Sequence, residues 1–205
     1  MQAGIPNRHE LRQRRRSIPP DIRTHAASAL AGQILSLPGL ATHRYIAGYW
    51  AVDGEISLHI LQQRLPAECI WCLPVLDEAS KQLKFAQWRA GDALVNNRYG
   101  IPEPAHTRNT LLDARQMHLI VLPLTGFDRH CHRLGMGGGW YDRTLAFRQN
   151  TDKRTPILLG AGFDLQEIAC ISPSPWDIAC DYIATESRLI KRQSSSGFSL
   201  QIPSF

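Results

Sequence analysis

Four glycines within five positions mark the part of the chain best suited to binding a phosphate group. Residues 133–143 read RLGMGGGWYDR. Glycine lets the backbone approach a ligand closely and adopt positive φ. A helix expected from Tyr141 would offer free N–H groups directly after the loop, where anions bind. Arg133 and Arg143 add positive charge, and Asp142 has the oxygen ligands that Mg²⁺ prefers, so this segment indicates a nucleotide-phosphate site.

The glycine segment alone leaves a structural explanation open, in which the glycines only make a tight turn. Two standard phosphate motifs are excluded. No Lys follows the glycines, so the G-x-x-x-x-G-K-[ST] motif is missing, and the strand expected to end at Pro123 lies too far upstream of Gly135 for a dinucleotide-binding fingerprint.

Several residues outside the glycine segment have both a functional and a structural interpretation. Arg8 and Arg12 lie one turn apart in an expected basic helix, which favours joint contact with phosphate. Residues 14–16 are three arginines, and we interpret them as a solvated face. Glu55 could serve only the dipole of a helix starting at Ile56. Trp88 could be core or ligand wall, and Asp177 could be a metal ligand or a turn residue.

A C-x-x-C pair and a His-Cys-His run raise the alternative of zinc or redox chemistry. Leu73 and Pro74 follow the pair where a redox motif would begin a helix, and in a strand Cys69 and Cys72 would point to opposite faces. No second ordered pair of ligands accompanies them, and residues 130–132 stand in an expected loop. We therefore expect no zinc site.

Strands and helices alternate along the chain, which predicts an α/β domain. The expected helices are 9–16, 21–37, 56–65 and 141–148, and the expected strands are 45–50, 68–73, 83–88, 119–123, 156–160 and 182–184. The fully apolar run at 119–123 is typical of a strand buried in a parallel sheet. This order favours a mostly parallel sheet with helices on both faces.

Composition indicates one globular domain. The 205 residues are 43% hydrophobic and 20% charged, and no apolar run approaches the ~20 residues of a membrane span. We expect a cytoplasmic protein with reduced thiols, a domain covering residues 1–190 with a basic helix at 8–16, and a flexible tail at 191–205. The net charge of +5 predicts an anionic partner, such as phosphate, polyglutamate or nucleic acid.

The glycine segment resembles the signature of 5-formyltetrahydrofolate cyclo-ligases, also called methenyltetrahydrofolate synthetases. Further blocks resemble the same family in the same order, namely residues 10–16 (ELRQRRR), 53–57 (DGEIS), 73–75 (LPV), 100–104 (GIPEP), 122–128 (LPLTGFD) and 176–177 (WD). The blocks extend from about residue 8 to residue 185, and their combination is far more specific than any one of them.

This resemblance implies a fold and a reaction. The fold would be a three-layer α/β/α sandwich similar to the ribose-5-phosphate isomerase and CoA-transferase group. The reaction would be the Mg²⁺- and ATP-dependent cyclisation of 5-formyltetrahydrofolate to 5,10-methenyltetrahydrofolate, through a phosphorylated formyl group (an iminium phosphate) and with release of ADP and phosphate. The substrate could carry a polyglutamate tail. The sequence indicates no oligomeric state.

The resemblance also implies a role for individual residues. ATP would contact Arg8, Arg12, Arg133, Leu134, Gly135, Met136, Gly137, Gly138, Gly139, Trp140 and Tyr141. Of these, Arg133, Trp140 and Tyr141 would be catalytic. The folate would contact Glu55, Trp88 and Trp140, and Mg²⁺ would be held by Asp142 and Asp177. The family usually has Lys where this chain has Arg8, which is a conservative departure.

Two other functions compete with this interpretation. The basic first helix could bind RNA, but no nucleic-acid fold signature accompanies it and no aromatic residues alternate with its arginines. Alternatively, the chain could be a relative that binds folate or nucleotide without turnover. The intact glycine run, with Glu55, Arg133 and Asp142, argues against this loss of activity.

Overall fold

The computed structural model describes residues 7–42, 44–150 and 155–193. A seven-stranded sheet has the order β11-β10-β9-β6-β1-β2-β3. Its strands are β1 (Tyr45–Ala47), β2 (Ile70–Asp77), β3 (Gln82–Gln87), β6 (Leu119–Pro123), β9 (Ile157–Ala161), β10 (Tyr182–Ala184) and β11 (Leu189–Lys191). The five inner strands are parallel, and β3 and β11 pair antiparallel at the edges.

The order of the parallel strands places a topological switch point between β1 and β6. From β1 the chain goes to β2 on one side of the sheet, and it then returns to β6 on the other side. Ligands of doubly wound sheets bind outside the carboxyl ends of the strands at such a point. The loops that follow β1 and β6 are therefore the expected walls of the site.

Apolar side chains cover both faces of this sheet. Leu119 and Val121 of β6 point into a core between the sheet and helices α2 (Pro20–Leu35) and α3 (His59–Arg64). Ile120 and Leu122 point into a second core on the opposite face, which includes Leu145 of helix α4 (Trp140–Leu145). This two-sided burial explains why β6 reads as an unbroken apolar run.

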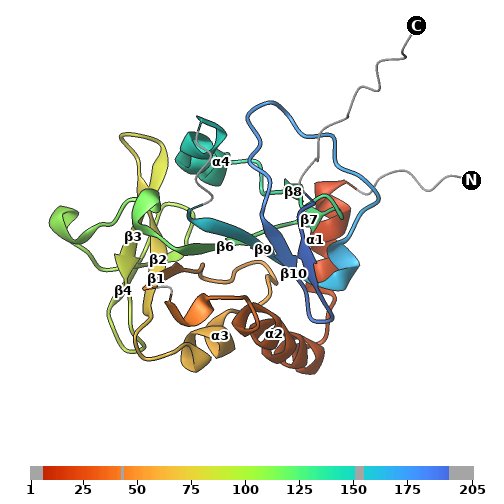
Figure 1. Ribbon diagram of the computed structural model, residues 1–205, viewed down its shortest axis with the longest axis horizontal. Helices are drawn as coiled ribbons and strands as arrows, with labels where there is room; N and C mark the ends of the chain where they lie inside the picture. Colours follow the sequence, from red (N-terminus) through yellow and green to blue (C-terminus); the bar gives the residue numbers. More distant parts are fainter. Residues whose placement is uncertain (1–6, 43, 151–154, 194–205) are drawn as a thin grey trace, which may run out of the picture.

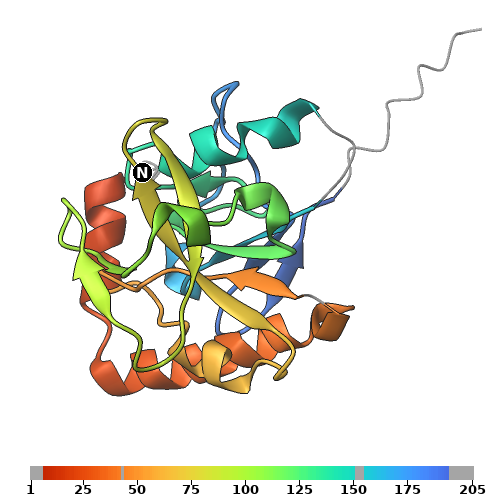
Figure 2. The ribbon, with the colours of Figure 1, turned by 90° about the vertical axis from the view of Figure 1, so that its left-hand side faces the viewer.

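The predicted three-layer α/β/α fold is confirmed. Figures 1 and 2 show α2 and α3 below the sheet and α4 above it, with helix α1 (Arg8–Arg16) beside one end of the sheet. Two short ladders lie outside the main sheet. They are formed by β4 (Leu94–Asn96) with β5 (Pro102–Pro104) and by β7 (Gly126–Phe127) with β8 (Arg133–Leu134).

Several expected boundaries were wrong. Helix α3 begins at His59 instead of Ile56, and Pro66 follows close behind its end. Strand β1 stops at Ala47, because the chain then turns into the loop of the switch point. Helix α4 ends at Leu145 and passes into a 3₁₀ turn (Ala146–Asn150). Lys191, the first residue of the expected tail, belongs to β11, and the extent of the domain stays a prediction. Residues 194–205 of the expected tail lie outside the described residues.

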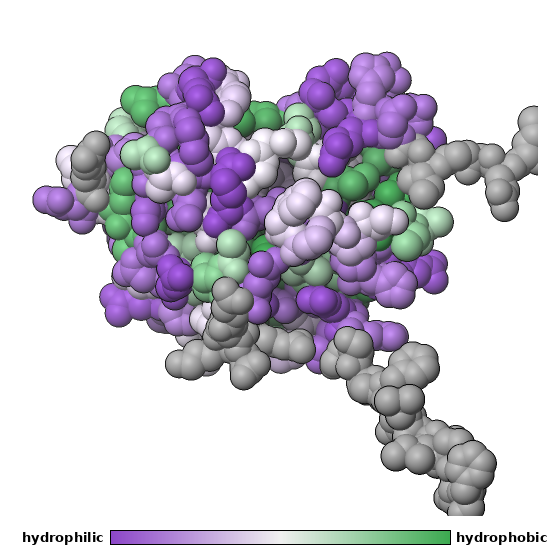
Figure 3. Space-filling view, turned by 90° about the horizontal axis from the view of Figure 1, so that it is seen from above, coloured by the Kyte–Doolittle hydropathy of each residue, from purple (hydrophilic) through white to green (hydrophobic). Residues whose placement is uncertain are grey.

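The surface over α4 is mostly hydrophilic, with small scattered apolar areas (Figure 3). Among the described residues, no helix is long and apolar enough to cross a membrane.

Gly48 connects β1 to the loop of the switch point, and its lack of a side chain is required by packing. A Cβ atom there would lie 2.1 Å from Cζ2 of the buried Trp71. We expect Gly48→Ala to lower the free energy of unfolding by about 1–3 kcal/mol, because the core must shift to admit the methyl group. Denaturant unfolding would measure the change.

Gly32 provides the matched control for this prediction. It lies in α2, and a Cβ atom there would meet nothing within 4 Å. Gly32→Ala should therefore raise stability by roughly 0.5–1 kcal/mol through helix propensity. Equal effects of the two changes would contradict the packing explanation.

Candidate active site

Helix α1 joins the two loops of the switch point through a buried arginine. Arg15 is fully buried. Its Nε donates to the main-chain oxygen of Asp53, in the loop after β1, at 3.0 Å. Its Nη1 donates to the main-chain oxygen of Leu124, directly after β6, at 3.1 Å. The interpretation of residues 14–16 as a solvated face was therefore wrong for Arg15, because two buried carbonyl groups require a donor there.

The Asp53 carboxylate forms ion pairs with three arginines of α1. It accepts hydrogen bonds from Arg12 Nε at 2.7 Å, from Arg15 Nη2 at 2.9 Å and from Arg16 Nε. Burial alone would raise the pKa of Asp53, but the hydrogen bonds from Arg12 and Arg16 bring that pKa below its ordinary value. Asp53 itself has a positive φ of 53°, and Gly54 has a φ of 77°. The ion pairs thus hold a strained turn directly before Glu55.

Glu55 is a buried acid at the centre of this arrangement. Its side chain is 7% exposed, Oε2 accepts the Val52 N–H at 3.1 Å, and Oε1 lies 3.8 Å from Arg15 Nη1. Burial raises the pKa of Glu55 to about 6, against the lowering effects of the Val52 hydrogen bond and of Arg15. The helix starts only at His59, so the alternative that Glu55 serves a helix dipole loses its basis.

Two tyrosines lie within range of the charge of Glu55. The hydroxyl of Tyr49 donates to the main-chain oxygen of Ile56 at 2.8 Å. Tyr141, in α4, is half-buried. Burial and the charge of Glu55 both raise the pKa values of Tyr49 and Tyr141. Glu55 is therefore electrostatically coupled to the loop after β1 and to the first turn of α4.

The glycine loop follows β8 and leads into α4. Gly137 has a φ of 93°, and Gly139, the N-cap of α4, has a φ of 64°, so both use glycine's freedom in the left-handed region. Arg8 Nε of α1 donates to the main-chain oxygen of Gly135 at 3.1 Å. Two motifs 127 residues apart in sequence therefore meet. Because α4 has only six residues, arginines and loop amides must carry most of any phosphate binding.

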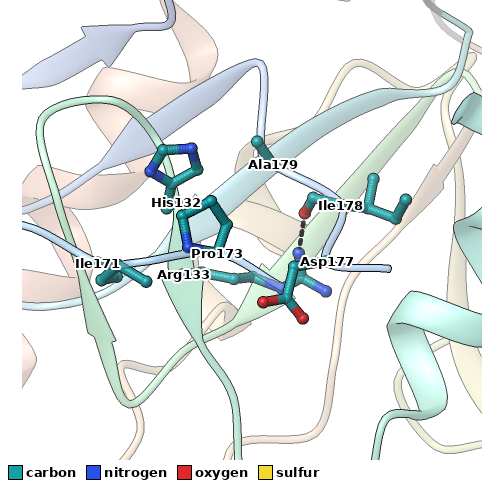
Figure 4. A pocket seen from close by; sticks show the side chains of 7 residues that line it. All are labelled: His132, Arg133, Ile171, Pro173, Asp177, Ile178 and Ala179. Atoms are coloured by element: carbon teal, nitrogen blue, oxygen red, sulfur yellow. Dashed lines mark hydrogen bonds between the residues drawn. The ribbon is translucent and has the colours of Figure 1, made fainter. Parts of the chain in front are cut away.

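Arg133 and Asp142 form an ion pair at the start of α4. Arg133 Nη2 lies 2.7 Å from Asp142 Oδ1, and Arg133 Nη1 donates to the main-chain oxygen of Ile178, as Figure 4 shows. Asp142 Oδ1 also accepts the Ile178 N–H at 3.3 Å. Asp177 is exposed, and its Oδ2 accepts the Ser174 N–H at 2.8 Å. Of the expected metal ligands, Asp142 thus pairs with Arg133 and Asp177 lines the same pocket as Arg133, and each already has a protein partner.

A shallow pocket lies beside Arg133 and contains about 190 Å³ of empty space. Its lining residues are His132, Arg133, Ile171, Pro173, Asp177, Ile178 and Ala179 (Figure 4). Part of this space is open solvent, so the pocket does not enclose enough volume for a folate or a nucleotide.

The described part of the chain contains no group of three or more His, Cys, Asp or Glu side chains that could hold a metal ion. Magnesium ions in nucleotide sites are commonly held by one or two carboxylates together with substrate phosphates. Asp142 and Asp177 are carboxylates of the type that this mode uses, and their role as metal ligands stays a prediction.

Two guanidinium groups approach the ring of Trp140 at the end of the glycine loop. The Cζ atoms of Arg98 and Arg143 stand 5.6 and 5.3 Å from the ring centroid, and Trp140 Nε1 donates to the Tyr99 hydroxyl at 3.4 Å. This arrangement leaves the indole at the edge of the site. Trp88, by contrast, is 8% exposed and lies in the core under α2 and α3. Its contact with a ligand stays a prediction.

The remaining loop residues separate into packing and exposed positions. Leu134 packs against the cluster of Leu11, Ile168 and Ile171. Met136 is 52% exposed. Leu134 thus anchors the loop to α1, while Met136 faces outward.

Cys69 and Cys72 lie on opposite sides of the sheet, as predicted. Cys72 is buried in the core that contains Leu145, and Cys69 packs against the core under α2 and α3. The loop with His130 and His132 is fixed by the buried Asp128, whose carboxylate accepts both backbone N–H groups.

Fold and contacts together define a doubly wound α/β protein with a glycine loop and an arginine-rich helix at its switch point. The chain belongs to the 5-formyltetrahydrofolate cyclo-ligase family, whose model matches residues 3–186. The resemblance noted in the sequence is confirmed, and with it the assignment to a family of ligases that act in folate metabolism.

Curated relatives agree with this assignment. The chain is 31% identical over 181 residues to the 5-formyltetrahydrofolate cyclo-ligase of Escherichia coli K12, which covers 87% of this chain and 98% of that protein. It is 31% identical over 178 residues to the enzyme of the same name from Haemophilus influenzae, covering 83% of this chain and 91% of the relative.

Solved structures share the fold. The structure of Aquifex aeolicus 5,10-methenyltetrahydrofolate synthetase matches with a TM-score of 0.77 at 21% identity and covers 95% of each chain. That of a 5,10-methenyltetrahydrofolate synthetase from Mycoplasma pneumoniae matches with a TM-score of 0.67 at 19% identity, covering 87% of this chain and 96% of the other.

Proposed function

We propose that this chain converts 5-formyltetrahydrofolate into 5,10-methenyltetrahydrofolate, using Mg²⁺ and ATP and releasing ADP and phosphate. The family and its named relatives support the reaction. The observation that carries the proposal is the meeting of three segments at the switch point, where α1 contacts both the Glu55 loop and the glycine loop.

The proposed chemistry requires no protein nucleophile. The formyl oxygen attacks the γ-phosphorus of ATP, ADP leaves, and N5 carries the positive charge of an iminium phosphate. N10 then attacks the activated carbon and loses its proton to solvent. The C–O bond to phosphate breaks last, which leaves the 5,10-methenyl cation and inorganic phosphate. Catalysis therefore rests on positioning and on charge neutralisation.

The arginines and the glycine loop would bind ATP. Arg8 touches the loop at Gly135 and can extend toward a phosphate from there. Arg12, which pairs with Asp53, would exchange that carboxylate for a phosphate when the nucleotide binds. The main-chain N–H groups of residues 134–139, followed by Trp140 and Tyr141, would line the triphosphate. Arg133 would stabilise the charge of the transferred phosphoryl group.

Asp142 and Asp177 would hold Mg²⁺ in this proposal. The ion would supply positive charge that offsets the charge of the phosphates. Asp142 would hold it while remaining paired with Arg133, whose Nη2 lies 2.7 Å from Asp142 Oδ1. The exposed Asp177 would have to leave the Ser174 N–H to reach a shared ion.

The folate would bind at Glu55. The pterin edge is rich in N–H donors, and the buried carboxylate of Glu55 is an acceptor with few competing partners. Trp140, at the edge of the site, would line the formyl group or the pterin, and Trp88 would support this wall from the core. We also propose that the substrate can carry a polyglutamate tail and that the protein works in the cytoplasm.

The RNA-binding alternative is weakened by the ion pairs of α1. Arg12, Arg15 and Arg16 all pair with Asp53, so these three arginines are less available to a polyanion than the sequence implies.

Product formation tests the proposal. Purified protein with 5-formyltetrahydrofolate, ATP and Mg²⁺ should generate the methenyl chromophore, followed by absorbance, with one ADP per product. Both signals should disappear when Mg²⁺ is chelated. A folded protein that binds ATP or folate but forms no product would instead support the non-catalytic relative.

A further inference from the structure

Arg15 of α1 is not marked as a site residue by the sequence, yet the structure buries it completely. It shares the helix with Arg8 and Arg12, for which the proposed function has a use, yet it is the fully buried arginine of α1. A buried guanidinium is costly unless each of its donors is satisfied. Its donors reach the Asp53 carboxylate, the Asp53 carbonyl and the Leu124 carbonyl.

The same guanidinium faces Glu55. Arg15 Nη1 lies 3.8 Å from Glu55 Oε1, and the two side chains are 1% and 7% exposed. At this distance and burial the charge of Arg15 acts on Glu55 with little screening by solvent. Hydrogen bonds to both loops hold the planar guanidinium of Arg15 in place. Arg15 is therefore a fixed partner for Glu55.

Asp53 competes with Glu55 for this charge. Arg15 Nη2 donates to Asp53 Oδ2 at 2.9 Å, which is shorter than its approach to Glu55. The other charged or titratable groups that act on Glu55 are Arg12 of α1, Tyr49 of the loop after β1 and Tyr141 of α4. The guanidinium of Arg15 therefore interacts closely with the Asp53 carboxylate and more weakly with the Glu55 carboxylate.

We propose that Arg15 is a positioning residue that orients Glu55 for the folate, and that Asp53 sets how much of the charge of Arg15 reaches Glu55. This inference rests on the proposed function, in which ionised Glu55 binds the pterin. It assigns to Arg15 a role in folate affinity, distinct from the phosphate contacts of Arg8 and Arg12.

Two substitutions should shift the pH at which folate affinity is lost, in opposite directions. Burial brings the pKa of Glu55 to about 6, Arg15 lowers it and Asp53 raises it. Folate affinity should therefore fall as pH drops through about 6. In Arg15→Gln this loss should move to higher pH, by about one unit, because Glu55 loses its cation. In Asp53→Asn it should move to lower pH, because the neighbouring negative charge that raises the pKa of Glu55 is removed.

The experiment is calorimetric titration of the full chain with 5-formyltetrahydrofolate between about pH 5 and about pH 8. Arg15→Gln should also weaken binding roughly 10-fold at neutral pH, while ATP affinity changes less than about twofold. Arg14→Gln, which removes an exposed arginine from the same helix, is the control and should match the wild type.

Each outcome decides the inference. Opposite shifts in the two variants support it, since a merely structural role would weaken binding without moving the pH dependence. Unmoved pH dependence, or an equal loss of ATP affinity, overturns it. If Arg15→Gln does not fold, the shift in Asp53→Asn decides alone. Failure of the proposed function would look different, because the wild type would then bind folate with these shifts yet form no product. Absence of folate binding by the wild type overturns both.

Discussion

Asp142→Asn is expected to lower turnover by on the order of 100-fold, while the affinity for 5-formyltetrahydrofolate changes by less than about threefold. Asp142 stands in the first turn of α4, directly after the glycine loop, and pairs with Arg133. Asparagine keeps an oxygen acceptor for the Ile178 N–H but loses the negative charge. Steady-state rates at saturating ATP, measured over a series of Mg²⁺ concentrations, would test this expectation.

The dependence on Mg²⁺ separates the two roles that Asp142 could have. If Asp142 is a metal ligand, the variant needs more Mg²⁺ and recovers part of its rate at high concentration. If it only orients Arg133, the rate falls equally at all Mg²⁺ concentrations, which would remove the metal role. Asp177→Asn is the matched comparison. Its carboxylate is exposed and caps the Ser174 turn, so we expect a smaller effect.

Glu55→Gln is expected to weaken 5-formyltetrahydrofolate roughly 10- to 100-fold and to leave ATP affinity nearly unchanged. A hydrogen bond to a charged group is worth about 1.5–3 kcal/mol, which corresponds to this range of affinity. The amide also presents an N–H₂ group that repels the pterin donors. Equal weakening of folate and ATP, measured by titration with each ligand, would contradict the assignment.

The same variant should be at least as stable as the wild type at neutral pH. The pKa of Glu55 in the fold, about 6, lies above its ordinary value of 4.5, so any stability gained from protonation is present below pH 4.5 and is lost as pH rises through 6. At pH 7 the buried negative charge costs the fold on the order of 2 kcal/mol. Gln removes this cost. A loss of folate binding with unchanged or higher Tm would therefore reflect the site and not unfolding.

Strong local patterns allowed much of the fold to be predicted. The apolar run at Leu119–Pro123 gave the central strand with its bounds, because burial on both faces leaves no other pattern. Some short elements were missed, although the three-residue β10 was predicted with its bounds. β11 consists of three residues, and β4 and β5 form a separate two-stranded ladder. Such strands are defined by their partners rather than by their own sequence.

The sequence motifs of the candidate site could be predicted, but the contacts between them could not. The glycine loop and Arg8 were both expected, and their contact is a matter of topology that no local pattern contains. Arg15 and Asp53 were missed as site residues. A run of arginines is usually solvated, and only the strand order puts one of them between two loops. The Asp53-Gly54 dipeptide, a turn signal, was the available hint of a left-handed backbone there.

Transfer of the formyl oxygen to phosphate tests the central claim most directly. We would label the formyl oxygen of 5-formyltetrahydrofolate with ¹⁸O, run the reaction with ATP and Mg²⁺, and analyse the released phosphate by mass spectrometry. If the site phosphorylates the formyl group, each methenyl product should leave one ¹⁸O in inorganic phosphate. Label recovered in water, with unlabelled phosphate, would show that ATP is hydrolysed separately and would contradict the phosphorylated intermediate.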